Sequence, residues 1–238
     1  MEKVRILDLF CKAGGCSVGY HRAFTELGMD VEITGVDIEP QKHYPYHFIR
    51  ADAMTFPLVG YDFAHASPPC QAYSKATPLS HRSDHMELIA PIRQRLMSSG
   101  LPFIIENVEG GRRLLDMPIM LCGTMFGLPI WRHRYFETHP SIFCLLPPCH
   151  HRHYTVSAHI NDKDRLVQVP VLCTGGADSK VSSRKMIRPR GKVAEIRWAM
   201  EIDWMTQSEL TEAIPPAYTH WLGLQIATVI RHNRLEVA

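Results

Sequence analysis

The sequence predicts an α/β fold built on a mostly parallel, doubly wound sheet. Two observations lead to it. Short apolar stretches alternate with helix-like stretches through the first half of the chain, and the glycine pair Gly14–Gly15 follows the first apolar stretch. Crossover helices that cover both faces of a parallel sheet produce this alternation. With 238 residues, 45% of them hydrophobic, the chain can form one sizeable core and a small additional region.

The individual elements follow from the spacing of apolar residues. Strands are predicted at residues 4–10, 33–36, 48–49, 63–66 and 103–105, and helices from the glycine pair through residues 20–27 and at residues 86–98. The tail from Ser208 to Arg231 is predicted to be helical, because Leu222, Ile226 and Ile230 recur at helical spacing. We expect this tail to pack on the sheet.

The amino-acid composition changes after Glu137. Residues 138–197 contain prolines, clustered histidines and a basic stretch, 180–197, with seven Lys or Arg against one Glu. We therefore expect a main domain of residues 1–137 plus 198–238 and a small inserted region of residues 138–197.

Charge and composition limit the classes of protein to consider. The net charge is only +2, so any binding to nucleic acid must come from a local patch. The sequence has no run of eighteen or more apolar residues, so a transmembrane span is not expected. The N-terminus shows no signal peptide and the seven cysteines have irregular spacing, which is typical of reduced thiols in the cytoplasm. We expect a cytoplasmic monomer with no membrane partner.

A first candidate site is the stretch DLFCKAGGCSVGYHRA, residues 8–23. A strand, a glycine turn and a helix in succession bring backbone N–H groups close to a ligand. The carboxylate of Asp37, at the end of the next strand, can accept hydrogen bonds from ribose hydroxyls. A helix N-cap is the alternative role for Asp37. Together the two features favour a cofactor of the adenosine type.

A second candidate is the stretch HASPPCQAYS, residues 65–74. Two prolines stiffen the backbone before Cys70, at the carboxyl end of a strand, where doubly wound sheets place their active sites. A buried cysteine usually packs as a small hydrophobic residue. Here the neighbours Ser67, Gln71, Tyr73 and Ser74 are polar, which favours a thiol held in a cleft.

Two further motifs supply acidic and basic side chains. In FIIENVEGG, an apolar strand leads directly to Glu106 and Asn107, at the same predicted edge as Cys70. A carboxyl group near apolar surface can hold a proton and act as an acid, although a loop carboxylate and a turn-forming Asn are the simpler roles. In RHRYFE, Arg132 and Arg134 are expected to share a face of a strand and to bind a carboxylate or phosphate, unless the run is solvated surface.

The ordered set DLFCKAGG, GVDIEP, ADA, SPPCQAYS, ENVEG and RHRYFE resembles the cytosine-5 DNA methyltransferase family. Near the C-terminus, ELTEAIPPAYTHWLGLQI resembles the closing motif of phage and prophage members. No motif matches the middle of the chain. The resemblance implies a Rossmann-like, S-adenosylmethionine-dependent methyltransferase sheet with a small inserted target-recognition region.

The resemblance also implies a mechanism and roles. The thiolate of Cys70 adds to carbon 6 of a cytosine flipped out of duplex DNA, and carbon 5 then takes the methyl group from S-adenosylmethionine. Glu106 contacts and protonates the ring at N3, and Asn107 holds the catalytic loop. Arg132 and Arg134 orient the flipped nucleotide and the Glu.

For the cofactor, the resemblance implies that Phe10 stacks on adenine, Asp37 binds the ribose hydroxyls and Asp52 meets the adenine amino group. The turn Ala13–Gly15 approaches the methionine part. The complete set of expected cofactor-binding residues is Asp8, Phe10, Lys12, Ala13, Gly14, Gly15, Asp37, Ile38, Asp52 and Pro69.

Two positions depart from the family pattern. Lys12 replaces the first glycine of DLFxGxGG, and Ile130 stands where the family tends to carry Gln. Lys12 either points to solvent or pairs with an extra carboxylate on the cofactor, as in carboxy-S-adenosylmethionine, with carboxymethylcytosine as the product. A catalytically inactive DNA-binding relative and an RNA methyltransferase are further alternatives.

The expected partner is DNA. Basic side chains of the stretch 180–197 neutralise phosphates, which gives affinity without sequence preference; a solvated charged loop is the alternative. The expected DNA-binding residues are Gln71, Ser74, Arg184, Lys185, Arg188 and Arg190.

The stretch CLLPPCHHRH, residues 144–153, contains the residue types that bind zinc. Four donors must converge on the ion, whereas Cys149 and His150 are neighbours in the sequence. Cys173 is a possible fourth ligand. We favour a proline-bounded loop with surface histidines and therefore predict no metal.

Overall fold

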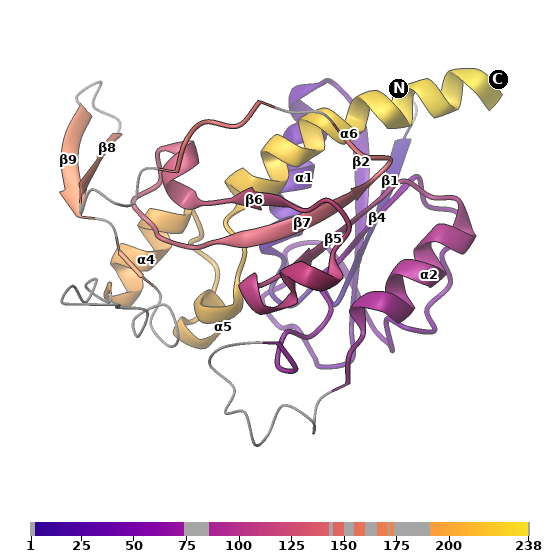
Figure 1. Cartoon of the computed structure of the whole chain (residues 1–238), viewed down its shortest axis with the longest axis horizontal. Helices are drawn as coiled ribbons and strands as arrows, with labels where there is room; N and C mark the ends of the chain where they lie inside the picture. Colours follow the sequence, from indigo (N-terminus) through magenta and orange to yellow (C-terminus); the bar gives the residue numbers. More distant parts are fainter. Residues whose placement is uncertain are drawn as a thin grey trace.

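A seven-stranded sheet in the order β3-β2-β1-β4-β5-β7-β6 forms the centre of the chain (Figure 1). The computed structural model describes residues 3–73, 86–142, 145–149, 155–159, 166–170, 172–173 and 191–237. The strands of the sheet are β1 (Lys3–Leu9), β2 (Asp30–Asp37), β3 (His47–Arg50), β4 (Phe63–Ala66), β5 (Phe103–Asn107), β6 (Ile119–Leu121) and β7 (Arg134–His139). The first five are parallel, and β7 runs antiparallel to both β5 and β6. The predicted mostly parallel, doubly wound sheet is confirmed.

The predicted strand at residues 63–66 coincides with β4, and β2, β3 and β5 contain the strands predicted for them. The strand predicted at residues 4–10 extends one residue past the end of β1 at Leu9. The prediction for RHRYFE is wrong in one respect. β7 begins at Arg134, so Arg132 precedes the strand and the two arginines do not share a strand face. The short edge strand β6 was not predicted, because three residues carry too little periodicity.

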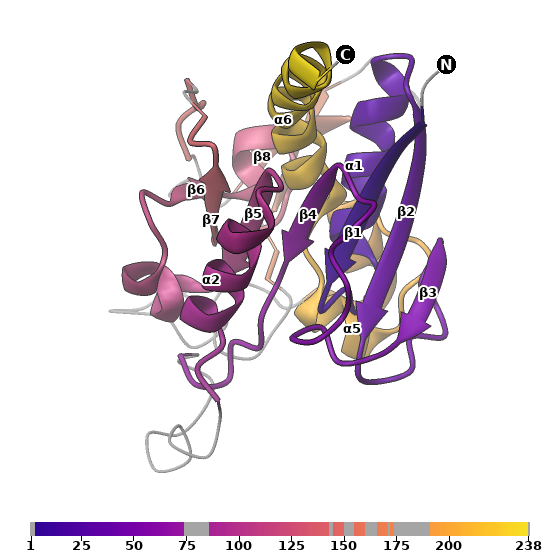
Figure 2. The ribbon, with the colours of Figure 1, turned by 90° about the vertical axis from the view of Figure 1, so that its right-hand side faces the viewer.

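Helices cover both faces of the sheet (Figure 2). On one face lie α1 (Gly15–Glu26) and α6 (Pro216–Val237), and on the other lies α2 (Ile89–Ser99). Side chains of a strand point alternately to the two faces. In β1, Ile6 therefore packs with the residues of α1 and α6, while Leu7 and Leu9 pack with those of α2.

Two small residues allow α1 and α6 to approach closely. A Cβ atom on Gly19 would lie 2.0 Å from Thr219 Oγ1, and one on Gly223 would lie 2.7 Å from the Cβ of Ala23. Glycine at both positions therefore lets the helix backbones come together.

The C-terminal tail packs on the sheet through Leu222, Ile226 and Ile230, which are all buried, as predicted. The predicted helical tail is divided into two helices. The tail forms α5 (Gln207–Glu212) and α6, because the segment before Pro216 includes Pro215, which has no N–H group to continue the hydrogen bonds of α5.

A third cluster of buried apolar residues lies beside the carboxyl edge of the sheet. It joins Ala13, just before α1, to α5 and to α4 (Val193–Met200), the helix that spans the end of the predicted inserted region. Figure 1 shows the hairpin of β8 (Thr155–His159) and β9 (Leu166–Pro170) at one end of the molecule, beyond α4. Among the described helices, none combines the length and apolar character needed to cross a membrane.

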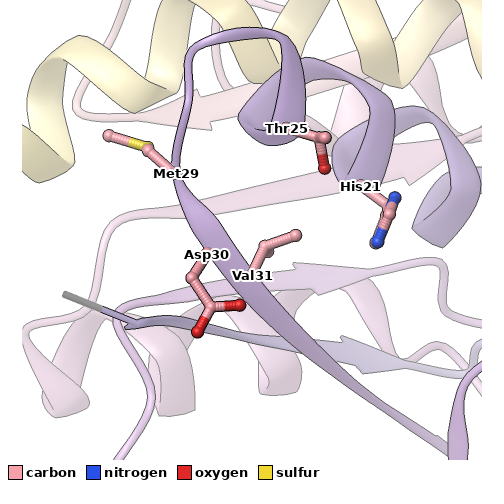
Figure 3. Close-up of a pocket in the computed structure, with 5 residues that line it drawn as sticks. All are labelled: His21, Thr25, Met29, Asp30 and Val31. Atoms are coloured by element: carbon pink, nitrogen blue, oxygen red, sulfur yellow. The ribbon is translucent and has the colours of Figure 1, made fainter. Parts of the chain in front are cut away.

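A hollow lies at the opposite edge of the sheet (Figure 3). Its lining side chains come from α1, the following loop and the start of β2: His21, Thr25, Met29, Asp30 and Val31. Because parallel strands place the carboxyl ends of β1, β4 and β5 at the other edge, this hollow is remote from the predicted site.

Glu137 of RHRYFE has a structural role. Its carboxylate is buried, accepts a hydrogen bond of 2.6 Å from Arg93 Nε and accepts another of 2.8 Å from the backbone of Asp116. Glu137→Ala is expected to lower the free energy of unfolding by about 2 kcal/mol, since charged hydrogen bonds are lost and the Arg93 cation loses its carboxylate partner. Urea unfolding followed by circular dichroism measures this change.

The matched control is Glu32→Ala. Glu32 forms an ion pair with Lys3 in which both side chains are about half exposed, so its removal should cost under about 1 kcal/mol. Equal losses for the two variants would contradict a special structural role for Glu137.

Candidate active site

Three strands reach the carboxyl edge of the sheet in register. In the parallel register, Leu9 of β1 pairs with Ala66 of β4, and Ala66 pairs with Ile105 of β5. The next residue of each strand, namely Phe10, Ser67 and Glu106, therefore stands at this shared edge. The predicted site residues of these three segments are brought together by the register.

Cys70 lies on a short turn that follows β4. Its side chain is partly buried, and its carbonyl accepts a hydrogen bond of 2.9 Å from the backbone of Tyr73. The buried side chain of Asn107 donates a hydrogen bond of 3.0 Å to the carbonyl of Pro68, which ties this turn to the end of β5. Pro69 and Gln71, on either side of the thiol, are exposed.

Burial and the nearby charges shift the pKa of the Cys70 thiol. Burial and then the carboxylate of Glu106 raise the pKa of Cys70, Arg134 opposes this shift, and Glu212 adds a small further increase. Cys70, Glu106, Arg134 and Glu212 thus form one electrostatic group, although they come from four separate segments of the chain.

Glu106 is buried and forms an ion pair with Arg134, with 3.2 Å between Oε1 and Nε. Burial raises the pKa of Glu106, and the cations of Arg134 and Arg132 oppose the shift. Within the described residues, Oε1 has no hydrogen-bond partner, because the ion pair does not have hydrogen-bond geometry. The carboxyl group is therefore poised to exchange a proton and to hydrogen-bond a ligand.

A row of hydrogen bonds from α1 and β4 ends at Ser67, which contacts Glu106. Tyr20 Oη lies 2.9 Å from His65 Nδ1, and His65 Nε2 lies 2.9 Å from Ser67 Oγ. Ser67 in turn lowers the pKa of Glu106 through a hydrogen bond. Burial lowers the pKa of His65 to about 3, so this imidazole is neutral at physiological pH. His65 and Ser67 are neighbours along β4 and its end, whereas Tyr20 joins them only through the packing of α1 on β4, for which the sequence contains no local signal.

Arg132 is not solvated surface. It is 1% exposed, and its Nη2 donates a hydrogen bond of 2.8 Å to the carbonyl of Thr211. Tyr218 Oη donates a hydrogen bond of 2.6 Å to the carbonyl of Arg132. These contacts join the arginine segment to α5 and α6.

Asp37 and Asp52 lie at the same edge, beyond β1. Asp37 is buried, and its two oxygens accept hydrogen bonds from the backbone of Lys12 at 3.1 Å and of Glu39 at 3.0 Å. Ala51 donates a hydrogen bond of 3.1 Å to the carbonyl of Asp37, which brings the exposed Asp52 next to it.

The turn at residues 10–15 is braced by the C-terminal part of the chain. Gly14 has a φ of +81°, which favours glycine, and a Cβ atom on Gly15 would lie 2.3 Å from the carbonyl oxygen of Ile214. Trp204 Nε1 donates a hydrogen bond of 2.8 Å to the carbonyl of Ala13. The structure thus explains both glycines by the path and packing of the chain itself.

Lys12 has a partner within the chain. Its ammonium group lies 3.4 Å from a carboxylate oxygen of Glu212, and both side chains are at least half exposed. The charge of Lys12 is therefore balanced by α5.

Asp8 provides a test of whether the edge suits a cofactor with an amino-acid part. The carboxyl group is buried, and its Oδ2 accepts a hydrogen bond from the hydroxyl of Ser17, which lies 2.6 Å from Tyr44 Oη. Its Oδ1 is buried without a hydrogen-bond partner in the part of the chain that is described. Burial raises the pKa of Asp8 to about 7. A donor such as an amino group would satisfy this oxygen.

The side chain of Ile38 is 63% exposed, and that of Phe10 is partly exposed. Because these two residues follow the adjacent strands β2 and β1, they offer apolar surface to a planar ring. Together with Asp8 and Asp37, they fit a cofactor with adenosine and amino-acid parts.

Five of the predicted DNA-binding residues lie outside the described residues: Ser74, Arg184, Lys185, Arg188 and Arg190. Conversely, Tyr20, His65 and Glu212 belong to the site and were not predicted.

Glu106→Gln is expected to lower the pKa of Cys70, because the substitution removes the carboxylate that raises it and leaves the Arg134 cation unopposed. Alkylation of Cys70 by iodoacetamide should therefore become faster at a fixed pH near 8. Peptide mass spectrometry of quenched samples over a range of pH measures the rate at Cys70 alone. An unchanged pH profile would show that the two groups do not interact.

Asp8→Asn is expected to stabilise the cofactor-free protein at high pH. A raised native pKa gives stability that is present below the ordinary value of 3.8 and is lost as the pH rises through about 7. The advantage of the variant should grow by roughly 2–4 kcal/mol between pH 4 and pH 8. Thermal or urea unfolding across this range measures it, and a constant difference would contradict the assignment.

Comparison with known proteins supports the fold. No protein-family model matches the sequence, and no curated protein matches it. Among solved structures, the chain resembles a methyltransferase of Entamoeba histolytica, EhMeth, with a TM-score of 0.60 and 12% identity over 96% of this chain and 99% of that one. It also resembles the S. pombe Dnmt2 methyltransferase, with a TM-score of 0.56, 12% identity and the same coverage. The chain therefore has the Rossmann-like fold of methyltransferases.

Proposed function

We propose that this chain transfers a methyl group from S-adenosylmethionine to carbon 5 of cytosine in DNA, with Cys70 as the nucleophile. The observation that carries the proposal is the convergence of a partly buried thiol with a buried carboxyl–guanidinium pair. Both stand at the carboxyl edge of a methyltransferase fold. The order of the sequence motifs resembles that of cytosine-5 DNA methyltransferases.

When bound, S-adenosylmethionine supplies an electrophilic methyl group. On this edge, Phe10 and Ile38 offer apolar surface to the adenine ring, and Asp37 can accept hydrogen bonds from the ribose. The unpartnered Oδ1 of Asp8 suits the amino group of the methionine part.

Cys70 would act on the other reactant. A thiolate that adds to carbon 6 breaks the 5,6 double bond of cytosine and moves electron density to carbon 5. Glu106, with its raised pKa, can supply the proton that N3 takes in this step. After carbon 5 has taken the methyl group, loss of its proton restores the double bond and expels the thiolate.

Arg134 and Asn107 would position these two groups. The 3.2 Å ion pair limits the conformations of Glu106, and the hydrogen bond from Asn107 to Pro68 limits those of the turn that carries Cys70. A turn held in this way reduces the loss of entropy on the path to the transition state.

DNA as the substrate follows from the resemblance of the motifs. The flipped base would enter above Cys70, beside the exposed Pro69 and Gln71. The basic residues of 180–197 are the proposed phosphate contacts, and the small net charge of +2 makes such a local patch necessary.

Incubation of the full chain with duplex DNA and S-adenosylmethionine, followed by nucleoside mass spectrometry, tests the proposal. We expect 5-methylcytosine with the wild type and at least about a 1,000-fold lower rate with Cys70→Ala, because covalent catalysis is lost. Parallel reactions with RNA and with carboxy-S-adenosylmethionine test the alternatives. A product found only in RNA, or a carboxymethyl product only, would overturn the corresponding part of the proposal.

Duplex DNA with 5-fluorocytosine tests the nucleophile directly. Fluorine at carbon 5 cannot leave as a proton does, so the bond between Cys70 and carbon 6 should persist after methyl transfer. Mass spectrometry of the digested protein should find the adduct on the peptide that contains Cys70. Methylated product without any adduct would point to another mechanism.

A further inference from the structure

A second group of reactive side chains lies away from Cys70. The sulfur atoms of Cys122 and Cys149 and a ring nitrogen of His133 all lie within 4.8 Å of one another. Cys122 is buried, whereas Cys149 and His133 are partly buried, so the group has one side in the protein and one side open to solvent. No step of the proposed methyl transfer uses these three residues.

The spacing of the group matches that of ligands around one ion. Cys149 Sγ lies 3.5 Å from His133 Nε2. Zinc–sulfur bonds of about 2.3 Å and zinc–nitrogen bonds of about 2.0 Å at the tetrahedral angle separate sulfur and nitrogen ligands by roughly 3.5 Å. The atoms of Cys149 and His133 are therefore separated as two ligands of one ion would be.

Regular structure holds two of the ligands in place. Cys122 directly follows β6 and begins the short helix η3 (Gly123–Phe126), where its backbone N–H lies 3.2 Å from Met125 Sδ. His133 directly precedes β7, the strand paired with β6. Ligands fixed by neighbouring strands form a site that loses little entropy when it binds an ion.

A hydroxyl group stands beside both sulfurs. Thr124 Oγ1 lies 3.5 Å from Cys122 Sγ and 3.7 Å from Cys149 Sγ. Hydrogen bonds from outer groups to ligand atoms orient the ligands and tune their affinity for the metal. The hydroxyl can supply such a bond to a thiolate.

We propose that Cys122, His133 and Cys149 bind a zinc ion. Thiolate and imidazole ligands without a carboxylate select zinc among the common divalent ions. On binding, the two thiols release their protons to solvent and no redox change takes place. The three residues leave the fourth coordination position to a water molecule or to a donor outside this group.

This proposal goes beyond the proposed function and replaces the prediction of no metal. The zinc ligands considered from the sequence were those within residues 144–153 together with Cys173. Cys122 and His133, which flank strands of the main sheet, were not among them. The ion would attach the segment 145–149 to the start of β7.

The position of His133 gives the ion a structural consequence. His133 stands between Arg132, which contacts Thr211, and Arg134, which forms the ion pair with Glu106. A metal ligand at this point would restrict the backbone that carries both arginines. The zinc site would therefore stabilise the arginine segment without touching a substrate.

Metal analysis of the full chain tests the proposal. Protein is reconstituted with zinc chloride and passed through a desalting column. Elemental mass spectrometry should then find one zinc ion per chain. Cys149→Ser and His133→Asn should bind zinc at least about tenfold more weakly. Both ligands are partly exposed, so these variants remain informative even if Cys122→Ser, at a buried position, fails to fold.

Cys11→Ser and Cys70→Ala are the matched controls, because each removes a thiol outside the group and should retain the full zinc content. Cobalt chloride in place of zinc should give the visible absorption of a tetrahedral thiolate site in the wild type and not in Cys149→Ser. Chelation should lower the melting temperature of the wild type more than that of Cys149→Ser.

Three results would overturn the proposal: wild-type protein without zinc after reconstitution, zinc content unchanged in both ligand variants, or a disulfide between Cys122 and Cys149 in place of metal. These measurements do not depend on methyl transfer. An inactive enzyme that binds zinc would contradict the proposed function alone.

Discussion

The parallel register of β1, β4 and β5 is the constraint on which the site depends. Leu9, Ala66 and Ile105 stand at one level, so each strand delivers its next residues to the same edge. The backbone hydrogen bonds between the strands are sufficient to bring the Cys70 turn and Glu106 to the same edge. A slip of one residue in β5 would turn Glu106 toward the opposite face.

That edge is where the protein buries charge, which is costly for stability. Among the described residues, each buried charged group at this edge has at least one compensating contact. Glu106 has Arg134, Arg132 has the carbonyl of Thr211, and Asp8 has the hydroxyl of Ser17. The unsatisfied oxygens of Asp8 and Glu106 remain as a cost. Such incomplete compensation is expected where a site is built to bind a ligand instead of to maximise stability.

The sequence predicted the fold better than it predicted the surroundings of the site. β4 was predicted to the residue, because a short apolar stretch ends at the polar SPPC segment. The break between α5 and α6 was missed, since the helical spacing continues on both sides of Pro215. Arg132 was assigned to a strand because two arginines one residue apart suggest alternation. Its actual partners, Thr211 and Tyr218, are far away in the sequence.

By itself, the sequence determined the alternation of strands and helices and the set of residues at the strand ends, because both follow from local periodicity and turn chemistry. Only the tertiary structure decided which distant groups join them. Tyr20 and His65 reach Glu106 through the packing of α1 on the sheet, and Glu212 reaches Lys12 because α5 returns to the first turn. Likewise, Cys122 and His133 meet because β6 pairs with β7, and Cys149 reaches them from the separate segment 145–149. Contacts of this kind depend on how helices and strands pack, and local spacing carries no record of that packing.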